Sequence, residues 1–181
     1  LTFATFPSQI LGGPTWTQVR VAREPVKSPG DAVDILVAFN DEAYQEHRGE
    51  VRDGGAILLD PSVTPDPSDK GRRTIAVPFD DLAKQTGEAR AANMGVIGAL
   101  SKLINMPVGY FKEFVSTRFA GREGVIKANH QALELGLEHV ADEDPITDLG
   151  EPDKPAYVQS FIKGNDALSL GALAAGLEFY V

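Results

Sequence analysis

The stretch Asp34-Ile35-Leu36-Val37-Ala38-Phe39-Asn40-Asp41, or DILVAFND, decides the fold class. Its apolar run has the length of a strand and no polar alternation, so it predicts a strand buried on both faces of a parallel sheet. Asn40 or Asp41 can cap the helix expected over 42–50, and the acidic first turn of that helix suits the positive end of its dipole. This start is typical of a β-α-β unit.

The residues after this helix predict the second strand of that unit. Asp53-Gly54-Gly55 is expected to turn the chain into Ala56-Ile57-Leu58-Leu59-Asp60, a second apolar run that ends at Pro61. Three prolines with Ser, Asp and Gly predict a surface loop over 61–71. A short strand over 74–77 and a short helix over 79–86 should follow.

Three longer amphipathic helices are expected next and should cover the sheet. Their expected core faces are Met94, Ile97, Leu100 and Ile104 in 88–104, then Val108, Phe111, Val115 and Phe119, then Ile126, Leu133, Leu137 and Val140.

The composition changes after these helices. Residues 141–157 are rich in Asp, Glu and Pro, which predicts a linker between domains. Beyond it we expect a strand stub at Phe161-Ile162, a turn at Gly164-Asn165, a helix over 167–175 and a strand over 178–181. Residues 158–181 would then be the first β-α-β of a second, truncated domain.

Composition excludes several classes of protein. The 181 residues are 43% apolar and 24% charged, with no run near the ~20 apolar residues of a membrane span and no secretory signal in residues 1–6. We therefore expect a cytoplasmic protein with no membrane partner. The net charge of -9 opposes nucleic-acid binding, which requires clustered Lys and Arg. With no cysteine, the chain can ligate no iron–sulfur cluster by thiolate.

Two places qualify as binding sites. In the loop from Ser8 to Pro14, Gly12 and Gly13 allow backbone amides to approach an anion closely, and Ser8 adds a hydroxyl; the alternative is an ordinary tight turn between two strands. Asn40 lies at the carboxyl end of a parallel strand, where open α/β sheets bind ligands; the alternative is a plain helix cap.

No catalytic or metal-binding residue can be assigned. Nothing in the sequence pairs a nucleophile with a base. His47, His130 and His139 lie at helical positions among charged neighbours, so we expect solvated side chains and not converging metal ligands.

Several stretches, taken in order, resemble one known family. They are Phe6–Pro14 (FPSQILGGP), Thr17–Ala22 (TQVRVA), Asp34–His47 (DILVAFNDEAYQEH), Ala91–Leu100 (AANMGVIGAL) and Phe161–Tyr180 (FIKGNDALSLGALAAGLEFY). The family is the 2-oxoacid:ferredoxin oxidoreductases, in the arrangement with a gamma domain fused ahead of the alpha subunit, as in the 2-oxoglutarate type.

The resemblance implies an α/β fold with three parts. Residues 1–140 would be a Rossmann-like open-sheet gamma domain flanked by helices, 141–157 the linker, and 158–181 the start of a thiamine-pyrophosphate-fold domain. The gamma domain's Gly-rich first strand and turn, and the oxoacid loop after the tail, are both missing, so these residues alone should be inactive.

The resemblance also implies the reaction and its partners. The enzyme would oxidatively decarboxylate a 2-oxoacid, 2-oxoglutarate in the first instance, to acyl-CoA and CO₂ with reduction of ferredoxin. Thiamine pyrophosphate with Mg and the iron–sulfur cluster would lie on a partner, the beta subunit. Coenzyme A would be the co-substrate of the enzyme, and the Ser8–Pro14 loop would bind its phosphates.

Two other functions stay open. One is a noncatalytic module that binds coenzyme A or assembles subunits. The other is a nicotinamide-dependent Rossmann enzyme, which is disfavoured because no G-x-G-x-x-G follows a strand.

Overall fold

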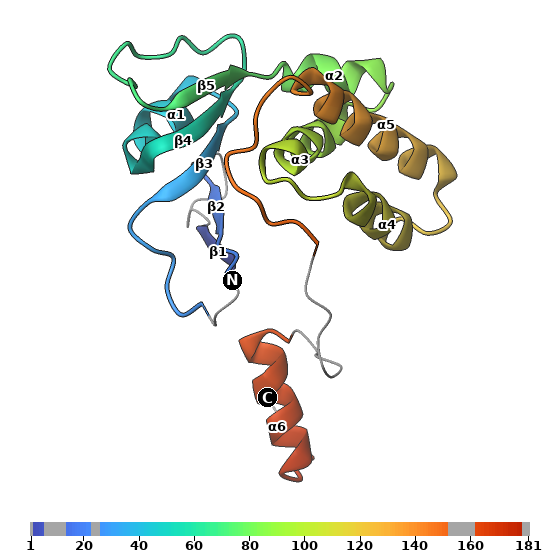
Figure 1. Cartoon of the computed structure of the whole chain (residues 1–181). Helices are drawn as coiled ribbons and strands as arrows, with labels where there is room; N and C mark the ends of the chain where they lie inside the picture. Colours follow the sequence, from blue (N-terminus) through green and yellow to red (C-terminus); the bar gives the residue numbers. More distant parts are fainter. Residues whose placement is uncertain (1, 6–13, 23–25, 152–161, 179–181) are drawn as a thin grey trace. The chain divides into compact units, whose positions relative to one another are not determined.

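The computed structural model describes residues 2–5, 14–22, 26–151 and 162–178. The chain divides into two compact units, Leu1–Glu151 and Pro152–Val181, which are described separately. The elements of the first unit (Figure 1) are β1 (Thr2–Thr5), β2 (Trp16–Val19), β3 (Val33–Ala38), α1 (Asp41–His47), the 3-10 turn η1 (Arg48–Glu50), β4 (Val51–Leu59), β5 (Arg73–Ala76), α2 (Phe79–Gln85), the 3-10 turn η2 (Ala89–Ala91), α3 (Ala92–Leu103), α4 (Val108–Arg118) and α5 (Glu123–His139).

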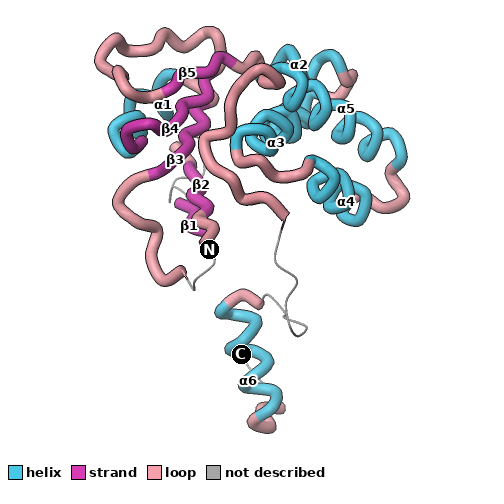
Figure 2. The backbone as a smooth tube through the Cα atoms, viewed as in Figure 1, coloured by secondary structure: helices cyan, strands magenta, loops and turns pink. Residues whose placement is uncertain are grey.

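A three-stranded parallel sheet organises this unit (Figure 2). The strand order is β3-β4-β5, with Ala38 opposite Leu59 and Leu59 opposite Ala76. The predicted β-α-β unit and α/β fold are therefore confirmed. Burial on both faces holds for the central strand β4, whose residues 55–59 are all buried. It is wrong for β3, which is half-buried over 35–37 because it lies at the edge of the sheet.

The predicted turn at Asp53-Gly54-Gly55 is wrong, because β4 already begins at Val51 and runs through these residues. Gly54 has a φ of +75°, and the pairing of β4 with β3 shifts register between Val33 and Ile35. A Cβ on Gly55 would lie 2.7 Å from the Asp34 carbonyl oxygen. The glycines thus form an irregularity inside a longer strand, a common position for glycine in sheets.

One face of the sheet is covered by α1 and by the connection from β4 to β5. The buried cluster on this face contains Ala38, Tyr44, Val51, Ile57, Leu59 and Val63. Residues 60–72, here named the crossover, join two parallel strands without any helix. Parallel strands are usually connected through a helix. Because this connection has none, the face is covered by α1 together with the crossover.

The other face is covered by α2 and α3. Its cluster contains Ala56, Leu58, Ile75, Val77, Phe79, Leu82, Val96, Ala99, Leu103 and Val140. Helix α5 packs mainly on α3, and α4 packs on α3 and α5. The expectation that all three long helices cover the sheet is therefore wrong for α4. Helix α5 lies mainly in a second layer, and it reaches the sheet cluster through Leu135 and, just beyond its end, through Val140.

Three glycines bring α3 and α5 unusually close. A Cβ on Gly98 would lie 2.0 Å from the Leu133 carbonyl oxygen, and a Cβ on Gly136 would lie 1.9 Å from the Gly95 carbonyl oxygen. The two backbones are therefore in direct contact.

This contact turns α3 away from its predicted core face. Val96, Ala99 and Leu103 are buried, while the expected residues Met94, Ile97, Leu100 and Ile104 are half-buried. In α4 only Val115 of the expected face is fully buried. Leu133 of α5 and Val140 just beyond it are buried as expected, with Ile126 and Leu137 half-buried.

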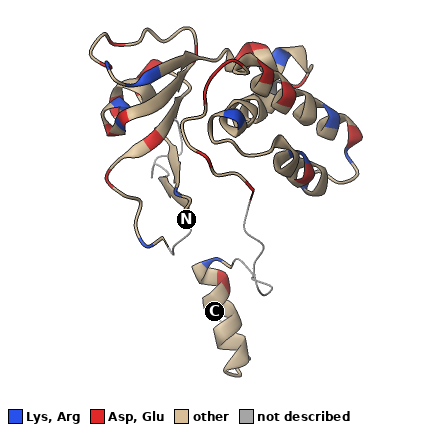
Figure 3. Cartoon of the chain, in the orientation of Figure 1, with Lys and Arg blue, Asp and Glu red and all other residues tan. Residues whose placement is uncertain are grey.

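Residues 141–151, here named the strap, belong to the first unit. Their backbone amides donate to the last carbonyls of α3: Ile146 to Leu103 at 2.7 Å, and Leu149 to Ile104 at 2.9 Å. Acidic residues recur along it (Figure 3). The first eleven residues of the predicted linker, 141 through 151, are thus fastened to the domain.

The second unit consists of α6 (Gly164–Ala174) among its described residues. The predicted turn at Gly164-Asn165 is wrong, because these residues begin the helix. Ile162 and Glu178 lie outside any strand, and the other residues of the two predicted strands, Phe161 and 179–181, lie outside the described part. No residue of α6 is buried. In neither unit is a described helix long and apolar enough to cross a bilayer.

Candidate functional site

The carboxyl ends of β3, β4 and β5 lie in register at one edge of the sheet. Phe39 and Asn40 follow β3, Asp60 follows β4, and Val77 follows β5, where its amide donates to the Leu59 carbonyl at 2.8 Å. Ligands of open α/β sheets bind outside this edge. The carboxyl edge is therefore the candidate site.

Asn40 caps α1 at this edge. Its Oδ1 accepts a hydrogen bond from the Ala43 amide at 2.8 Å, and its carbonyl oxygen accepts from the Tyr44 amide at 3.1 Å. An extended Ncap residue whose side chain accepts from the third helical amide is the expected geometry. The predicted position is confirmed, and one side-chain atom already serves the helix, so a ligand role for Asn40 stays a prediction.

A small acidic hollow of about 210 Å³ opens at the carboxyl edge, next to the ends of β4 and β5. It is lined by Asp60, Pro61, Pro78, Asp80, Asp81 and Lys84. Asp60 Oδ1 accepts from the Ser62 amide at 3.0 Å and from the Ser62 hydroxyl at 2.6 Å. Lys84 Nζ donates to Asp81 at 2.8 Å, which raises the pKa of Lys84. Three carboxylates against one paired cation repel phosphate groups.

An aromatic pair completes the edge. The rings of Phe39 and Phe79 have centroids 4.8 Å apart at an angle of 45°. Phe79 is buried, while Phe39 is 48% exposed. The edge therefore offers an apolar ring surface next to carboxylates, which suits an uncharged or cationic group better than a polyphosphate.

The predicted anion loop connects the two strands of a hairpin. Ser8, Gly12 and Gly13 lie outside the described residues, while the antiparallel pair β1 and β2 on either side is described, with Thr5 opposite Trp16. The hairpin is tied to the segment before β3, because Gln18 Nε2 donates to the Pro29 carbonyl at 3.0 Å. Both readings of the loop, a phosphate cradle or a plain connection, stay open.

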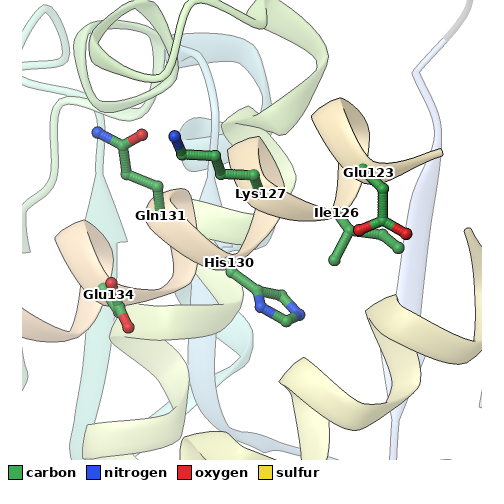
Figure 4. Close-up of a pocket in the computed structure, with 6 residues that line it drawn as sticks. All are labelled: Glu123, Ile126, Lys127, His130, Gln131 and Glu134. Carbon is green, nitrogen blue, oxygen red and sulfur yellow. The ribbon is translucent and has the colours of Figure 1, made fainter.

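The histidines are less solvated than expected. His47 is half-buried, lies edge-on to Trp16, and its Nδ1 is 3.0 Å from Glu50. His130 projects from α5 at the lining of a shallow pocket (Figure 4) and is also half-buried. Only His139 is exposed as predicted, with Nε2 2.9 Å from the Ala76 carbonyl.

His130 does not form a nucleophile–base pair with its nearest hydroxyl. The same Nε2 lies 3.0 Å from the Lys112 carbonyl oxygen and 3.2 Å from the Ser116 hydroxyl. A carbonyl can only accept, so Nε2 carries the proton and cannot take one from Ser116. Across the described ranges, no group of three or more His, Asp or Glu side chains is placed to hold a metal ion.

Sequence reasoning missed a polar cluster centred on Asp69, which is 7% exposed. Asp69 accepts hydrogen bonds from the Tyr44 hydroxyl, from Arg48 at 3.0 Å and from Arg72 at 3.0 Å. Burial first, and then the hydrogen bond to Asp69, raise the pKa of Tyr44. Arg72 Nε also donates to the Val51 carbonyl at 2.8 Å. Because Val51 begins β4, the cluster lies toward the amino end of the sheet, opposite the candidate site.

Comparison with known proteins identifies the family. The family model described as pyruvate ferredoxin/flavodoxin oxidoreductase matches residues 1–139. The chain belongs to this family. The expected family is thereby confirmed at the level of 2-oxoacid:ferredoxin oxidoreductase subunits, which are parts of enzymes.

Curated members of the pyruvate ferredoxin/flavodoxin oxidoreductase family are longer than this chain. Ketoisovalerate oxidoreductase subunit VorA of Methanothermobacter marburgensis is 33% identical over 130 residues, which is 70% of this chain and 27% of the relative. The alpha subunit of 2-oxoacid:ferredoxin oxidoreductase 2 of Aeropyrum pernix is 22% identical over 95% of this chain and 34% of the relative. The chain thus spans roughly a quarter to a third of these relatives.

Solved structures of the family match the fold. A structure of 2-oxoglutarate:ferredoxin oxidoreductase from Magnetococcus marinus with 2-oxoglutarate, coenzyme A and succinyl-CoA bound is 33% identical, with a TM-score of 0.85 over 97% of this chain and 32% of that chain. A gamma subunit of a keto/oxoacid ferredoxin oxidoreductase from Geobacter sulfurreducens shares the fold at 23% identity, a TM-score of 0.59, and 67% coverage of each chain.

Proposed function

We propose that this chain is part of the alpha subunit of a 2-oxoacid:ferredoxin oxidoreductase that decarboxylates 2-oxoglutarate to an acyl-CoA and CO₂. The observation that carries the proposal is the match to the Magnetococcus marinus enzyme, which extends over 97% of the chain at 33% identity. Relatives named for ketoisovalerate are equally similar in sequence, so a branched 2-oxoacid is the first competing substrate to test.

The proposed organisation is a gamma domain over 1–140, a connection over 141–157 and the start of the alpha domain over 158–181. Two observations support it. The match to one longer solved chain includes residues of both units. In addition, α6 carries few charged residues (Figure 3), and its Leu168, Leu170 and Leu173 are more than half exposed. Leucines exposed together on one helix mark a surface that another element is expected to cover.

The redox cofactors would belong to other chains. The sequence has no cysteine, so it offers no thiolate to an iron–sulfur cluster, and the described residues contain no cluster of three or more His, Asp or Glu placed to hold a metal ion. Thiamine pyrophosphate supplies the electron sink for decarboxylation when it is bound, and we place it with Mg on the beta subunit. Ferredoxin would accept the electrons. A cytoplasmic location suits such an enzyme and is proposed with it.

Coenzyme A is the ligand proposed for the gamma domain. The described carboxyl edge does not fit its phosphates, because Asp60, Asp80 and Asp81 line the hollow there. The loop that contains Ser8, Gly12 and Gly13 has the residue types for a phosphate cradle, and the hairpin strands hold both its ends. The uncharged pantetheine arm is the part that suits Phe39 and the nearby Asn40.

The test uses the full-length subunit, expressed together with its beta partner. We expect 2-oxoglutarate-dependent and coenzyme A-dependent reduction of ferredoxin or viologen. Pyruvate and ketoisovalerate are assayed separately as alternative substrates. Activity with ketoisovalerate alone would correct the substrate and keep the family chemistry. Inactivity with every 2-oxoacid, in a complex shown to hold its cofactors, would remove the proposal.

A noncatalytic module that binds coenzyme A or assembles subunits is the second candidate. Calorimetry with coenzyme A, comparing Gly13→Val with the unchanged chain, separates the two roles of the Ser8–Pro14 loop. Binding that survives Gly13→Val removes the Ser8–Pro14 loop from the proposed site, whichever function holds. Binding without turnover in the assembled complex favours the module.

A further inference from the structure

The strap is held from the inside by few contacts. The amides of Ile146, Thr147 and Leu149 donate to the Leu103 or Ile104 carbonyls at 2.7, 3.3 and 2.9 Å. These carbonyls end α3 and have no partner within the helix, so the strap caps α3. Ile146 is the one strap side chain that packs against the core cluster, and it is itself half-buried.

The strap is held from the outside by polar contacts near the surface. Arg73 pairs with Glu143 at 3.3 Å and donates to the Asp144 carbonyl at 2.5 Å. Asn105 Nδ2 donates to Asp148 Oδ1 at 2.8 Å. The Tyr110 hydroxyl donates to Glu151, the last residue of the unit. Each contact contributes little, because water competes for every partner.

The elements beneath the strap are held far more firmly. Helices α3 and α5 meet backbone to backbone at Gly98 and Gly136, and Leu103 and Leu133 are completely buried. Segments with few buried apolar contacts and exposed hydrogen bonds open at lower free energy than the core around them. The strap can therefore detach while α3 and α5 stay folded.

We propose that the strap is a releasable segment that gives the connection between the two units two lengths. When it is docked, the connection begins at Pro152. When it is released, the connection begins at Ala141 and gains eleven residues, which reach about 36 to 40 Å when fully extended. The second unit would then be held at short range or long range by one local equilibrium. The inference does not depend on the proposed enzyme.

Hydrogen exchange on the complete 181-residue chain tests the first half of the inference. The amides of Ile146, Thr147 and Leu149 should exchange at least about tenfold faster than those of α3. Ile146→Ala should speed strap exchange about tenfold more through the loss of its packing, with α3 unchanged. Ile126→Ala, an equally half-buried isoleucine on α5, is the matched control and should leave the strap rates unchanged.

A distance measurement tests the second half. Because the chain has no cysteine, Glu113→Cys on α4 and Ser169→Cys on α6 give two unique labels. Release in Ile146→Ala, or in the milder Asp148→Ala, should add a longer component to the distance distribution. Strap amides that exchange together with α3 in every variant overturn the inference. So does an unchanged distance distribution in both release variants.

Discussion

At the scale of single residues, Gly98 and Gly136 set the distance between α3 and α5. Any side chain at either position would overlap a backbone carbonyl on the facing helix. Backbone cannot move aside as a flexible side chain can, so the two helices would have to separate. The stability of the second helical layer therefore depends on the absence of a Cβ atom at Gly98 and Gly136.

Gly98→Ala should lower the free energy of unfolding by about 3 kcal/mol, the upper range for overpacking a core. Gly95→Ala on the same helix is the control, because its Cβ would lie 3.7 Å from Leu82, an ordinary contact. Denaturant unfolding followed by circular dichroism measures both. If Gly98→Ala were as stable as Gly95→Ala, the close crossing of the helices would be incorrect.

Tyr44→Phe should destabilise the unit by about 1 to 3 kcal/mol at neutral pH, because it leaves buried partners of the hydroxyl unpaired. The lost partners are the Asp69 carboxylate and the Asp66 amide, which donates to the hydroxyl at 2.7 Å.

The same substitution has a pH signature. The pKa of Tyr44 is raised in the folded protein, so the unfolded chain loses this proton first as the pH rises. Stability from this group is complete below about pH 10 and declines above it. Unfolding midpoints at pH 8 and above pH 10 should fall less in Tyr44→Phe than in the unchanged chain. An equal fall would exclude this role for Tyr44.

Residue-level prediction from sequence succeeded where the partners are neighbours in the chain. Asn40 caps α1 through an amide three residues away, a spacing that can be read directly. Tyr44 and Asp69 are 25 positions apart, and a tyrosine between acidic residues in a short helix gave no signal of burial. The role of Gly98 and Gly136 depends on the facing helix, so apolar periodicity within one helix does not predict it.

At the scale of elements, the crossover 60–72 takes the place of a helix. Its order comes from Asp69, which joins the crossover to Tyr44 of α1 and Arg48 of η1, and through Arg72 to the start of β5. A connection without repeating backbone hydrogen bonds needs such side-chain partners. One carboxylate therefore fixes the segment that leads away from the candidate site.

Asp69→Asn should destabilise the unit by about 2 to 3 kcal/mol, because two partly buried arginines lose a shared counter-charge. Asp66→Asn is the matched change. The Asp66 carboxylate is more exposed, and among the described residues its one salt bridge is to Arg48. We expect a clearly smaller loss, measured by thermal unfolding. Equal losses would show that burial of Asp69 contributes nothing.

Elements were predicted well and their borders less well. The strands and helices of 33–140 follow from apolar periodicity, which is local. Their core faces do not, because the face of α3 is chosen by its contact with α5. Asp and Pro made residues 141–151 resemble a free linker, yet the backbone amides there complete α3.

At the scale of the whole molecule, the two units should respond to mutation independently. Leu170→Glu with Leu173→Glu on α6 should leave the unfolding midpoint of the first unit unchanged, because no residue of α6 is buried. Solubility of the chain should rise. The unfolding midpoint of the first unit is measured by heating the chain and monitoring hydrogen exchange of the α3 amides. A shifted midpoint would mean that α6 packs on the first unit in solution.

The family was predicted from the order of motifs, while the candidate site was predicted in part. The parallel sheet places Asn40 at the expected edge, because strand direction follows from the β-α-β pattern. The acidic hollow could not be foreseen, since Asp60, Asp80 and Asp81 come together only when β4 and β5 end side by side.

The edge-on contact of Trp16 with His47 gives the protein an internal optical probe. The chain contains one tryptophan, and it lies on β2 with its ring centroid 6.1 Å from the imidazole. Tryptophan emission depends on the surroundings of the indole ring, so the fluorescence of Trp16 reports on the packing of the hairpin against α1. A ligand of the loop between β1 and β2 that shifts this hairpin can thus be followed by tryptophan emission, without any label.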